Sequence, residues 1–183
     1  MLAGVAVSEQ ICSFDALVDG RTRVLILGSI PGVASLQAVQ YYAHPRNAFW
    51  AIMAELFKFP PELNYAERCE RLATQGVGLW DTLRACERPG SLDSAIVETS
   101  IEANDFAGLL SAYPLIGAIF FNGAKSEQVF KRKVVPLMHE NNPTLLGLLH
   151  LERLPSTSPA NAGTPYSAKL QAWSSVSDTL QKL

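Results

Sequence analysis

Apolar residues occur along the chain in two patterns, short unbroken runs and longer amphipathic segments. Val24–Leu27 and Ile116–Phe121 are runs of the first kind, and each ends at a turn that contains glycine. A run that is apolar at every position is typical of a strand buried on both faces of a parallel sheet. Two further runs predict additional strands, Val77–Trp80 and Leu146–Leu151.

The segments between these runs have the periodicity of helices. From Asn47 to Phe59, apolar residues recur at positions i, i+3, i+4, i+7 and i+8, and Pro60-Pro61 ends the pattern. Pro165 suits the first turn of a helix that closes the chain. The predicted helices are Asn47–Phe59, Tyr65–Thr74, Asp105–Ala112, Ala124–Val134 and Pro165–Leu180.

The order of these elements predicts an α/β protein. Strands that alternate with helices favour a parallel sheet with helices on both faces. No repeat, low-complexity tract or linker divides the sequence, so we expect one domain over residues 1–183, with residues 1–20 as a peripheral N-terminal segment. Ligands of such folds bind where the carboxyl ends of the strands open into loops. The predicted site therefore lies at Gly28–Gly32, at Asn122-Gly123 and after Leu151.

The composition is that of an ordinary folded protein, with 48% apolar and 17% charged residues. The 15 Lys and Arg against 17 Asp and Glu give a net charge of −2, which argues against a nucleic-acid partner. Cys12, Cys69 and Cys86 form no CxxC pair, so we interpret them as reduced thiols and expect no metal site. No apolar run is long enough for a bilayer and no export signal is visible, so we expect a cytoplasmic protein without membrane contact.

The loop after the first strand is the first candidate site. It consists of Gly28, Ser29, Ile30, Pro31 and Gly32. The two glycines let the backbone bend and a ligand approach closely, while the proline stiffens the turn. Such a loop presents N–H groups to a phosphate or to the edge of a planar ring. The alternative interpretation is a tight turn between a strand and a helix.

A second candidate is the segment Tyr41–Trp50, which is dense in aromatic and hydrogen-bonding side chains. A flat heterocycle joined to a phosphate requires such a set, because a ring stacks on an aromatic face, an amide reads its edge or holds a water, and an arginine neutralises the phosphate. The structural alternatives are that Asn47 caps the following helix and that His44 packs in a loop.

The third candidate is the loop after the last predicted strand, Leu154–Asn161, which follows Arg153. Its small hydroxyl groups suit hydrogen bonds to backbone phosphates without a large charge. A generic polar loop is the alternative. The residues predicted to contact phosphates are Arg46, Arg153, Ser156, Thr157, Ser158 and Asn161.

Taken in order, the motifs GSIPG, YYAHPRNAFW, IFFNG and LPSTSPAN resemble those of the uracil-DNA glycosylase superfamily. Within it they are most similar to the hypoxanthine-DNA (deoxyinosine) glycosylase branch, which Leu79–Ile96 also resembles. The resemblance implies a three-layer α/β/α sandwich around a short parallel sheet. It also implies a monomeric, monofunctional glycosylase without a cofactor. Such an enzyme flips a damaged nucleotide out of double- or single-stranded DNA and hydrolyses its N-glycosidic bond to leave an abasic site.

The resemblance further implies roles for individual residues. The backbone of Gly28–Gly32 lines the base pocket, Tyr42 stacks on the flipped base, and Asn122 offers its carboxamide to the base edge. Ser156 and its neighbours grip the phosphates beside the lesion. In the deoxyinosine branch the asparagine of the HPRN segment is the catalytic residue, and here it is Asn47.

The sequence departs from the family pattern at two positions. Ser29 stands where many members carry Asp, Glu or Asn, and Leu154 stands where the uracil enzymes carry a His that stabilises the departing anion. The loss of that donor argues against efficient uracil release and is compatible with a purine, which leaves as a neutral species after ring protonation. Because an amide accepts no proton at pH 7, we expect Asn47 to orient water and to stabilise the cationic sugar. His44 is a candidate proton source.

Three other functions stay open at this point. They are a glycosylase for uracil, xanthine or mispaired bases, a catalytically weak module that recognises damaged nucleic acid, and a hydrolase of free nucleosides or nucleotides. The net charge excludes only a protein that binds DNA through a bulk positive field. We expect Arg46 and Arg153 near the mouth of the site and interpret Lys131-Arg132-Lys133 as a solvated face. Binding to few phosphates predicts a shallow salt dependence.

Overall fold

The computed structural model describes residues 10–183. Within this range, four strands form a central parallel sheet: β2 (Val24–Gly28), β3 (Val77–Asp81), β6 (Ala118–Asn122) and β7 (His150–Leu154). Their order across the sheet is β3-β2-β6-β7, and every neighbouring pair is parallel. The carboxyl ends of all four strands therefore lie at one edge of the sheet.

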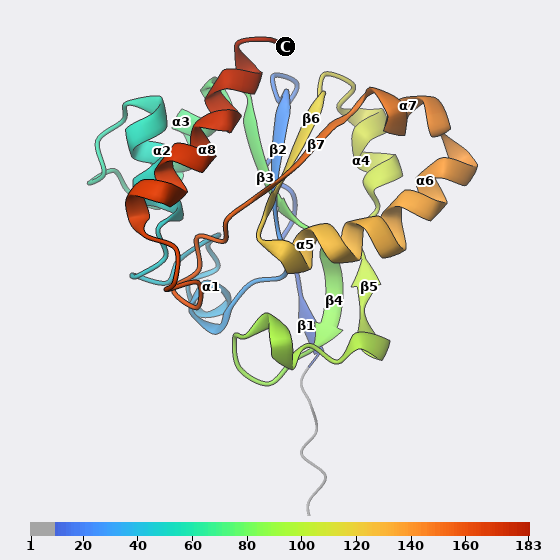
Figure 1. Cartoon of the computed structure of the whole chain (residues 1–183), viewed down its shortest axis with the longest axis horizontal. Helices are drawn as coiled ribbons and strands as arrows, with labels where there is room; N and C mark the ends of the chain where they lie inside the picture. The colour runs from blue at the N-terminus through green and yellow to red at the C-terminus, as the bar shows by residue number, and fades with distance from the viewer. Residues whose placement is uncertain (1–9) are drawn as a thin grey trace, which may run out of the picture.

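Helices cover both faces of this sheet. They are α1 (Val33–Ala38), α2 (Phe49–Phe57), α3 (Tyr65–Thr74), α4 (Phe106–Ala112), α5 (Ala124–Val129), α6 (Val135–Asn141), α7 (Pro143–Leu148) and α8 (Tyr166–Leu180). Figure 1 shows α2, α3 and α8 on one side of the sheet and α4 to α7 on the other. This arrangement confirms the predicted three-layer α/β/α sandwich.

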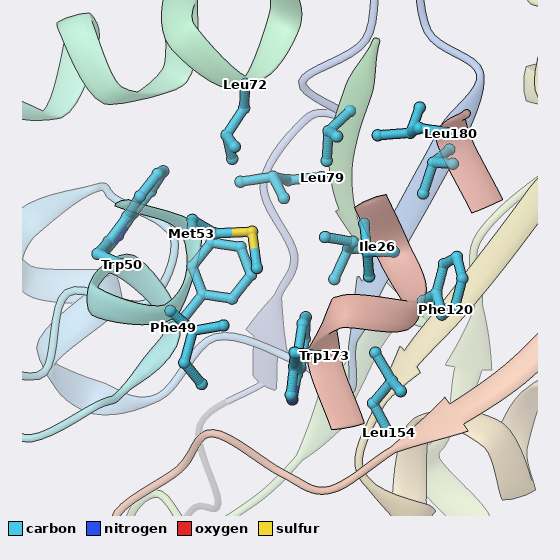
Figure 2. Close-up of a cluster of buried hydrophobic side chains, with 14 of the residues drawn as sticks. Ile26, Phe49, Trp50, Met53, Leu72, Leu79, Phe120, Leu154, Trp173 and Leu180 are labelled. Carbon is cyan, nitrogen blue, oxygen red and sulfur yellow. The ribbon is translucent and has the colours of Figure 1, made fainter. Parts of the chain in front are cut away.

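Strand β2 is buried along its whole length and divides the interior into two apolar clusters. Because side chains alternate along a strand, Val24 and Ile26 face one cluster while Leu25 and Leu27 face the other. Figure 2 shows the first cluster, in which the sheet meets side chains of α2 and α8: Ile26, Phe120, Phe49, Met53 and Trp173. Burial on both faces explains why the strand is apolar at every position.

A second, smaller sheet was not predicted. Its antiparallel strands are β1 (Gln10–Cys12), β4 (Leu83–Glu87) and β5 (Glu102–Ala103), and they lie beyond the carboxyl ends of the parallel strands (Figure 1). Leu17 also forms a bridge with Leu79 of β3. Residues 10–20 are therefore tied to both sheets, whereas the rest of the predicted peripheral segment, residues 1–9, lies outside the described residues.

The predicted strand Leu146–Leu151 is wrong in its first half. Residues up to Leu148 belong to α7, which begins after Asn142, whose side chain accepts a hydrogen bond from the N–H of Leu145 at 3.2 Å. A short apolar run fits a helix as well as a strand, and here the cap and Pro143 favour the helix. The strand is His150–Leu154 instead.

The predicted helix Ala124–Val134 continues further than expected. It passes from α5 through a π-helical stretch, Phe130–Val134, into α6 and ends at Asn141. Pro136 lies directly after the stretch, where a proline interrupts the regular hydrogen-bond pattern. No helix of residues 10–183 is long and apolar enough to cross a membrane.

Candidate active site

A cavity of about 410 Å³ opens at the carboxyl ends of β2, β3 and β6. The structure brings all three predicted segments together around it. The residues that line it include Gly28, Ser29, Ile30, Pro31, Gly32, Tyr42, His44, Asn47, Asn122, Ser156, Thr157, Ser158 and Asn161. Asp81 and the stretch Ser91–Asp93 line it as well, and neither was predicted.

The loop after β2 is held by hydrogen bonds from the segment that follows β4. Ser29 Oγ donates a hydrogen bond to Asp93 Oδ1 at 2.6 Å, and the carbonyl of Pro31 accepts one from the buried Arg88 guanidinium at 2.6 Å. A Cβ atom at Gly28 would lie 2.5 Å from Asp81 Oδ1, so only glycine leaves room for that carboxyl group. The loop is thus both the predicted turn and one side of the cavity.

Tyr42 lies in the left-handed backbone region, with φ of 56°. Its ring stacks on Phe49 of α2 with ring centroids 3.9 Å apart. The preceding residue is fixed by two side chains, because Trp50 Nε1 donates to the carbonyl of Tyr41 at 3.0 Å and the Tyr41 N–H donates to Tyr65 Oη at 3.0 Å. The strained backbone conformation is therefore held by packing, a situation that recurs at ligand-binding sites.

Asn47 and His44 both line the cavity and use one polar atom each to order the loop. Asn47 Oδ1 accepts a hydrogen bond from the Phe49 N–H at 3.0 Å, so the residue orders the turn into α2, whose N-cap is Ala48 and not Asn47 as predicted. Its Nδ2 has no partner among residues 10–183. His44 Nδ1 accepts from the Arg46 N–H at 3.1 Å, which places the proton of the neutral ring on Nε2.

Asn122 and Thr157 join the end of β6 to the last loop. Thr157 donates its N–H to Asn122 Oδ1 at 2.8 Å, and Asn122 Nδ2 donates to Thr157 Oγ1 at 2.8 Å. The carbonyl of Thr157 also accepts from the Ala48 N–H at 3.0 Å. Thr157 is 1% exposed, so the predicted phosphate contact does not fit its position. It is a positioning residue that links three segments of the site.

The rest of the last loop is ordered by its own hydrogen bonds. Asn161 Nδ2 donates to the carbonyl of Ser156 at 3.0 Å, and Ser156 Oγ accepts from the Ser158 N–H at 3.2 Å. The buried Lys169 of α8 donates to the carbonyl of Asn161 at 2.9 Å. These bonds hold the three polar residues at the rim of the cavity.

The two arginines predicted to contact phosphates do not line the cavity. Within the described range, neither Arg46 nor Arg153 lines the cavity, and Arg153 forms an ion pair with Glu127 at 3.3 Å. Two members of the basic cluster on the π-helical stretch are also paired, since Lys131 contacts Glu127 and Arg132 contacts Glu98. This agrees with the interpretation of the cluster as a solvated face, and it leaves the cavity itself without a free cation from these residues.

Asp81 is the main site residue that the motifs did not identify. It is the last residue of β3, beside Gly28 of β2, and it is 3% exposed. Its Oδ2 has no hydrogen-bond partner in the part of the chain that the structure describes. Burial, and to a lesser extent the negative charge of Asp93, raises the pKa of Asp81 to about 8, while Arg88 lowers it.

A signal for Asp81 was present in the sequence. The residue directly follows an apolar run, at the same strand edge as Gly28 and Asn122, and it lies inside the segment Leu79–Ile96. The strand-end rule that identified the other loops applies to it equally. Asp93 lies in the same segment but not at a strand end, and its contact with Ser29 depends on how the second sheet places the loop after β4.

Comparison with known proteins identifies the family. A model of the uracil DNA glycosylase superfamily matches residues 14–177. The chain belongs to the uracil DNA glycosylase superfamily. This confirms the family resemblance that the four motifs indicated.

Two curated relatives are both named hypoxanthine DNA glycosylase. The protein from Methanosarcina acetivorans is 35% identical over 150 residues, which are 81% of this chain and 86% of the relative. The protein from Methanosarcina barkeri is 38% identical over 114 residues, which are 62% of this chain and 71% of the relative. A solution NMR structure of a candidate uracil DNA glycosylase from M. acetivorans matches with a TM-score of 0.76 at 32% identity, covering 94% of this chain and 99% of that one.

Proposed function

We propose that the chain is a monofunctional DNA glycosylase that flips a deaminated base out of DNA, with hypoxanthine as its preferred base, and hydrolyses its N-glycosidic bond. The observation that carries this proposal is the convergence of the GSIPG loop, Tyr42, Asn47 and Asn122 on one cavity of a chain whose curated relatives are named hypoxanthine DNA glycosylase. The cavity volume of about 410 Å³ is in the range that holds a small planar ligand.

The base is bound in this proposal by stacking and by the surrounding backbone. Phe49 supports the ring of Tyr42 from behind at 3.9 Å, so Tyr42 offers a rigid platform to a flipped base. Asn122 has both ends of its carboxamide bonded to Thr157, which fixes its orientation at the pocket. One N–H and one lone pair of the carboxamide then remain for the Tyr42 hydroxyl beside it and for the edge of the base.

Asn47 is the proposed catalytic residue. Its Oδ1 is held by the Phe49 N–H, so its free Nδ2 has a fixed direction and can orient the attacking water. The second lone pair of Oδ1 is available to the positive charge that develops on the sugar. Because Nδ1 of His44 accepts a hydrogen bond from the backbone, we assign His44 a role as donor through Nε2.

Contacts to DNA are assigned to the loop of Ser156, Ser158 and Asn161 at the rim, with Arg46 and Arg153 reaching phosphates outside the cavity. Arg46 is exposed, and Arg153 must leave Glu127 to take part. The substrate is double- or single-stranded DNA with a damaged base, and one copy of the chain contains every residue of the proposed site. We therefore propose that it acts as a monomer.

The test is a panel of duplex oligonucleotides that each carry one hypoxanthine, uracil or xanthine. The protein is added in excess and the products are treated with hot alkali, which cleaves the strand at abasic sites. We expect cleavage at hypoxanthine, and a loss of about 100- to 1000-fold in rate for Asn47→Ala. Asn141→Ala, an exposed asparagine on α6, is the matched control and keeps the rate. An intact hypoxanthine strand, or full activity of Asn47→Ala, contradicts the assignment.

A further inference from the structure

Two carboxyl groups face the proposed base cavity, and their environments are opposite. Asp81 is 3% exposed and ends a buried strand, whereas Asp93 is exposed and lies in a short 3₁₀ helix. Asp93 Oδ1 accepts the hydroxyl hydrogen of Ser29, while Asp81 Oδ2 has no partner within residues 10–183. A pair of carboxyl groups treated so differently by their surroundings is the usual arrangement for an acid and its ionised neighbour.

The groups around Asp81 supply no cation that pairs with it. Arg88 is the nearest positive charge, but it donates to the carbonyls of Gly90 at 2.9 Å and Pro31 at 2.6 Å. The other neighbours of Asp81 are the hydroxyls of Tyr41 and Tyr42 and the carboxylate of Asp93. Asp93 disfavours a negative charge on Asp81, and the neutral tyrosine hydroxyls supply no positive charge to balance it.

Asp81 and Tyr42 meet at one point of the cavity. A Cβ at Gly28 would lie 2.5 Å from Asp81 Oδ1 and 3.4 Å from Tyr42 Oη, so both side chains converge over that glycine. The Tyr42 hydroxyl is also buried. Asn122 lies near it, but within residues 10–183 the hydroxyl forms no hydrogen bond of normal geometry. Buried polar atoms are nearly always hydrogen-bonded, so two converging side chains that each carry a buried atom without such a bond point to a ligand that bonds to both.

We propose that Asp81 is a further catalytic residue, whose protonated carboxyl group contacts the edge of the flipped base and gives its proton to a ring nitrogen as the base leaves. The inference rests on the proposed function above. Burial without a counter-charge keeps the carboxyl neutral at pH 7, and the raised pKa of about 8 agrees with this. A neutral carboxyl group can donate a hydrogen bond. The other side-chain donors of the pocket are amide, hydroxyl and imidazole groups.

The step balances without a further reactant. The bond between C1′ and the purine nitrogen breaks and its electron pair stays on the base, while the Asp81 proton bonds to another ring nitrogen, so that the base leaves neutral. Water oriented by Asn47 forms the new bond to C1′ and loses one proton to solvent. Asp81 regains a proton from solvent after the base departs. Asp81, on another strand, thereby replaces the His of the uracil enzymes at whose position this chain has Leu154.

The test compares wild type with Asp81→Asn in single-turnover cleavage of the hypoxanthine duplex from pH 5 to pH 9.5. Asparagine keeps the size and a donor but has no proton to give, so we expect a loss of about 100-fold or more at pH 7. The wild-type rate should fall above about pH 8, and the variant should lack that fall. Asp178→Asn, an exposed aspartate on α8, is the matched control.

A measurement that needs no activity accompanies it. NMR titration of the Asp81 carboxyl carbon in the free wild-type protein, assigned by its absence in Asp81→Asn, should give a midpoint far above that of an ordinary aspartate. A midpoint below pH 5, or an Asp81→Asn variant with the wild-type rate and pH profile, overturns the proposal. Wild-type protein that leaves hypoxanthine intact contradicts the proposed function instead. In that case the titration, together with the pH profile on whichever base is released, still decides the role of Asp81.

Discussion

Two sets of residues around the cavity differ in how far their polar atoms are hydrogen-bonded. In the first set, which we call the bonded wall, Asn122 and Thr157 bond to each other at both ends, and Ser156, Ser158 and Asn161 bond within their loop. In the second set, the open wall, Asp81 Oδ2 and the Tyr42 hydroxyl are buried without a hydrogen bond of normal geometry in residues 10–183, and Asn47 keeps a free Nδ2.

This difference distinguishes residues that stabilise the fold from residues that act on the substrate. Polar groups that satisfy one another stabilise the fold, and removing one leaves its partner unsatisfied. Buried polar groups without partners cost stability and are retained where a ligand completes them. The comparison therefore predicts that changes in the bonded wall reduce stability, whereas removing the unpartnered groups of Asp81 or Tyr42 reduces activity and leaves stability equal or higher.

The largest effect is expected for the pH dependence of stability in Asp81→Asn. The folded-state pKa of Asp81 lies near 8 and above that of an unfolded aspartate, so the folded protein holds a proton that the unfolded chain releases near pH 4. Wild-type stability should then fall as pH rises through this window, by at most about 1.4 kcal/mol per unit. The variant lacks this contribution. Urea unfolding at pH 5 and pH 7 measures the two slopes, and equal slopes contradict a neutral Asp81.

Asn122→Ala should lower the free energy of unfolding by about 2 kcal/mol, because it leaves the buried Thr157 N–H and hydroxyl without partners. Thermal or urea unfolding measures the change, with Asn141→Ala as the control on an exposed helix end. Activity should fall together with stability. A fully stable Asn122→Ala variant would remove the basis for calling this wall a scaffold.

Tyr42→Phe is the counterpart on the open wall. It removes only a buried hydroxyl that forms no hydrogen bond of normal geometry in the described chain, so stability should stay the same or rise slightly. We expect cleavage of hypoxanthine to slow by about tenfold, the value of one hydrogen bond to the base. Single-turnover rates and melting curves give both quantities. A destabilised variant with an unchanged rate would reverse the assignment.

The smallest effect concerns the arginines outside both walls. Arg46→Ala should reduce the slope of log K against log salt for duplex binding by about one, the value of one phosphate contact. Arg153→Ala should change it less, because Arg153 is paired with Glu127. Titrations at several salt concentrations measure the slopes. A wild-type slope steeper than about −5 contradicts binding through few phosphates.

Much of this organisation could be predicted from the sequence. The apolar runs Val24–Leu27 and Ile116–Phe121 identified two strands of the sheet, and the rule that ligands bind at strand ends located Gly28–Gly32 and Asn122. The second sheet could not be predicted, because its strands are short and β1 pairs with β4 across more than seventy positions of the chain. The predicted boundary between α7 and β7 was wrong because apolar residues occur in both elements.

The sequence also could not predict which polar atoms of the site form hydrogen bonds. That Thr157 is a buried link depends on how the last loop folds over β6, and that Asp81 lacks a cation depends on where Arg88 places its donors. Both are tertiary facts about single atoms. Sequence motifs identified which segments meet, and the structure distinguishes the residues that hold the cavity from those left free to react.

The claim that the chain releases hypoxanthine from DNA with Asn47 as catalytic residue is tested most directly by the rate of strand cleavage. Wild-type protein in excess is incubated at pH 7 with a duplex that carries a single hypoxanthine, and alkali-labile sites are counted over time beside an undamaged duplex. The account predicts one cleavage product, at the hypoxanthine, which Asn47→Ala forms about 100- to 1000-fold more slowly and Asn141→Ala forms at the wild-type rate. An uncut hypoxanthine strand, or equal cutting by Asn47→Ala, would contradict it.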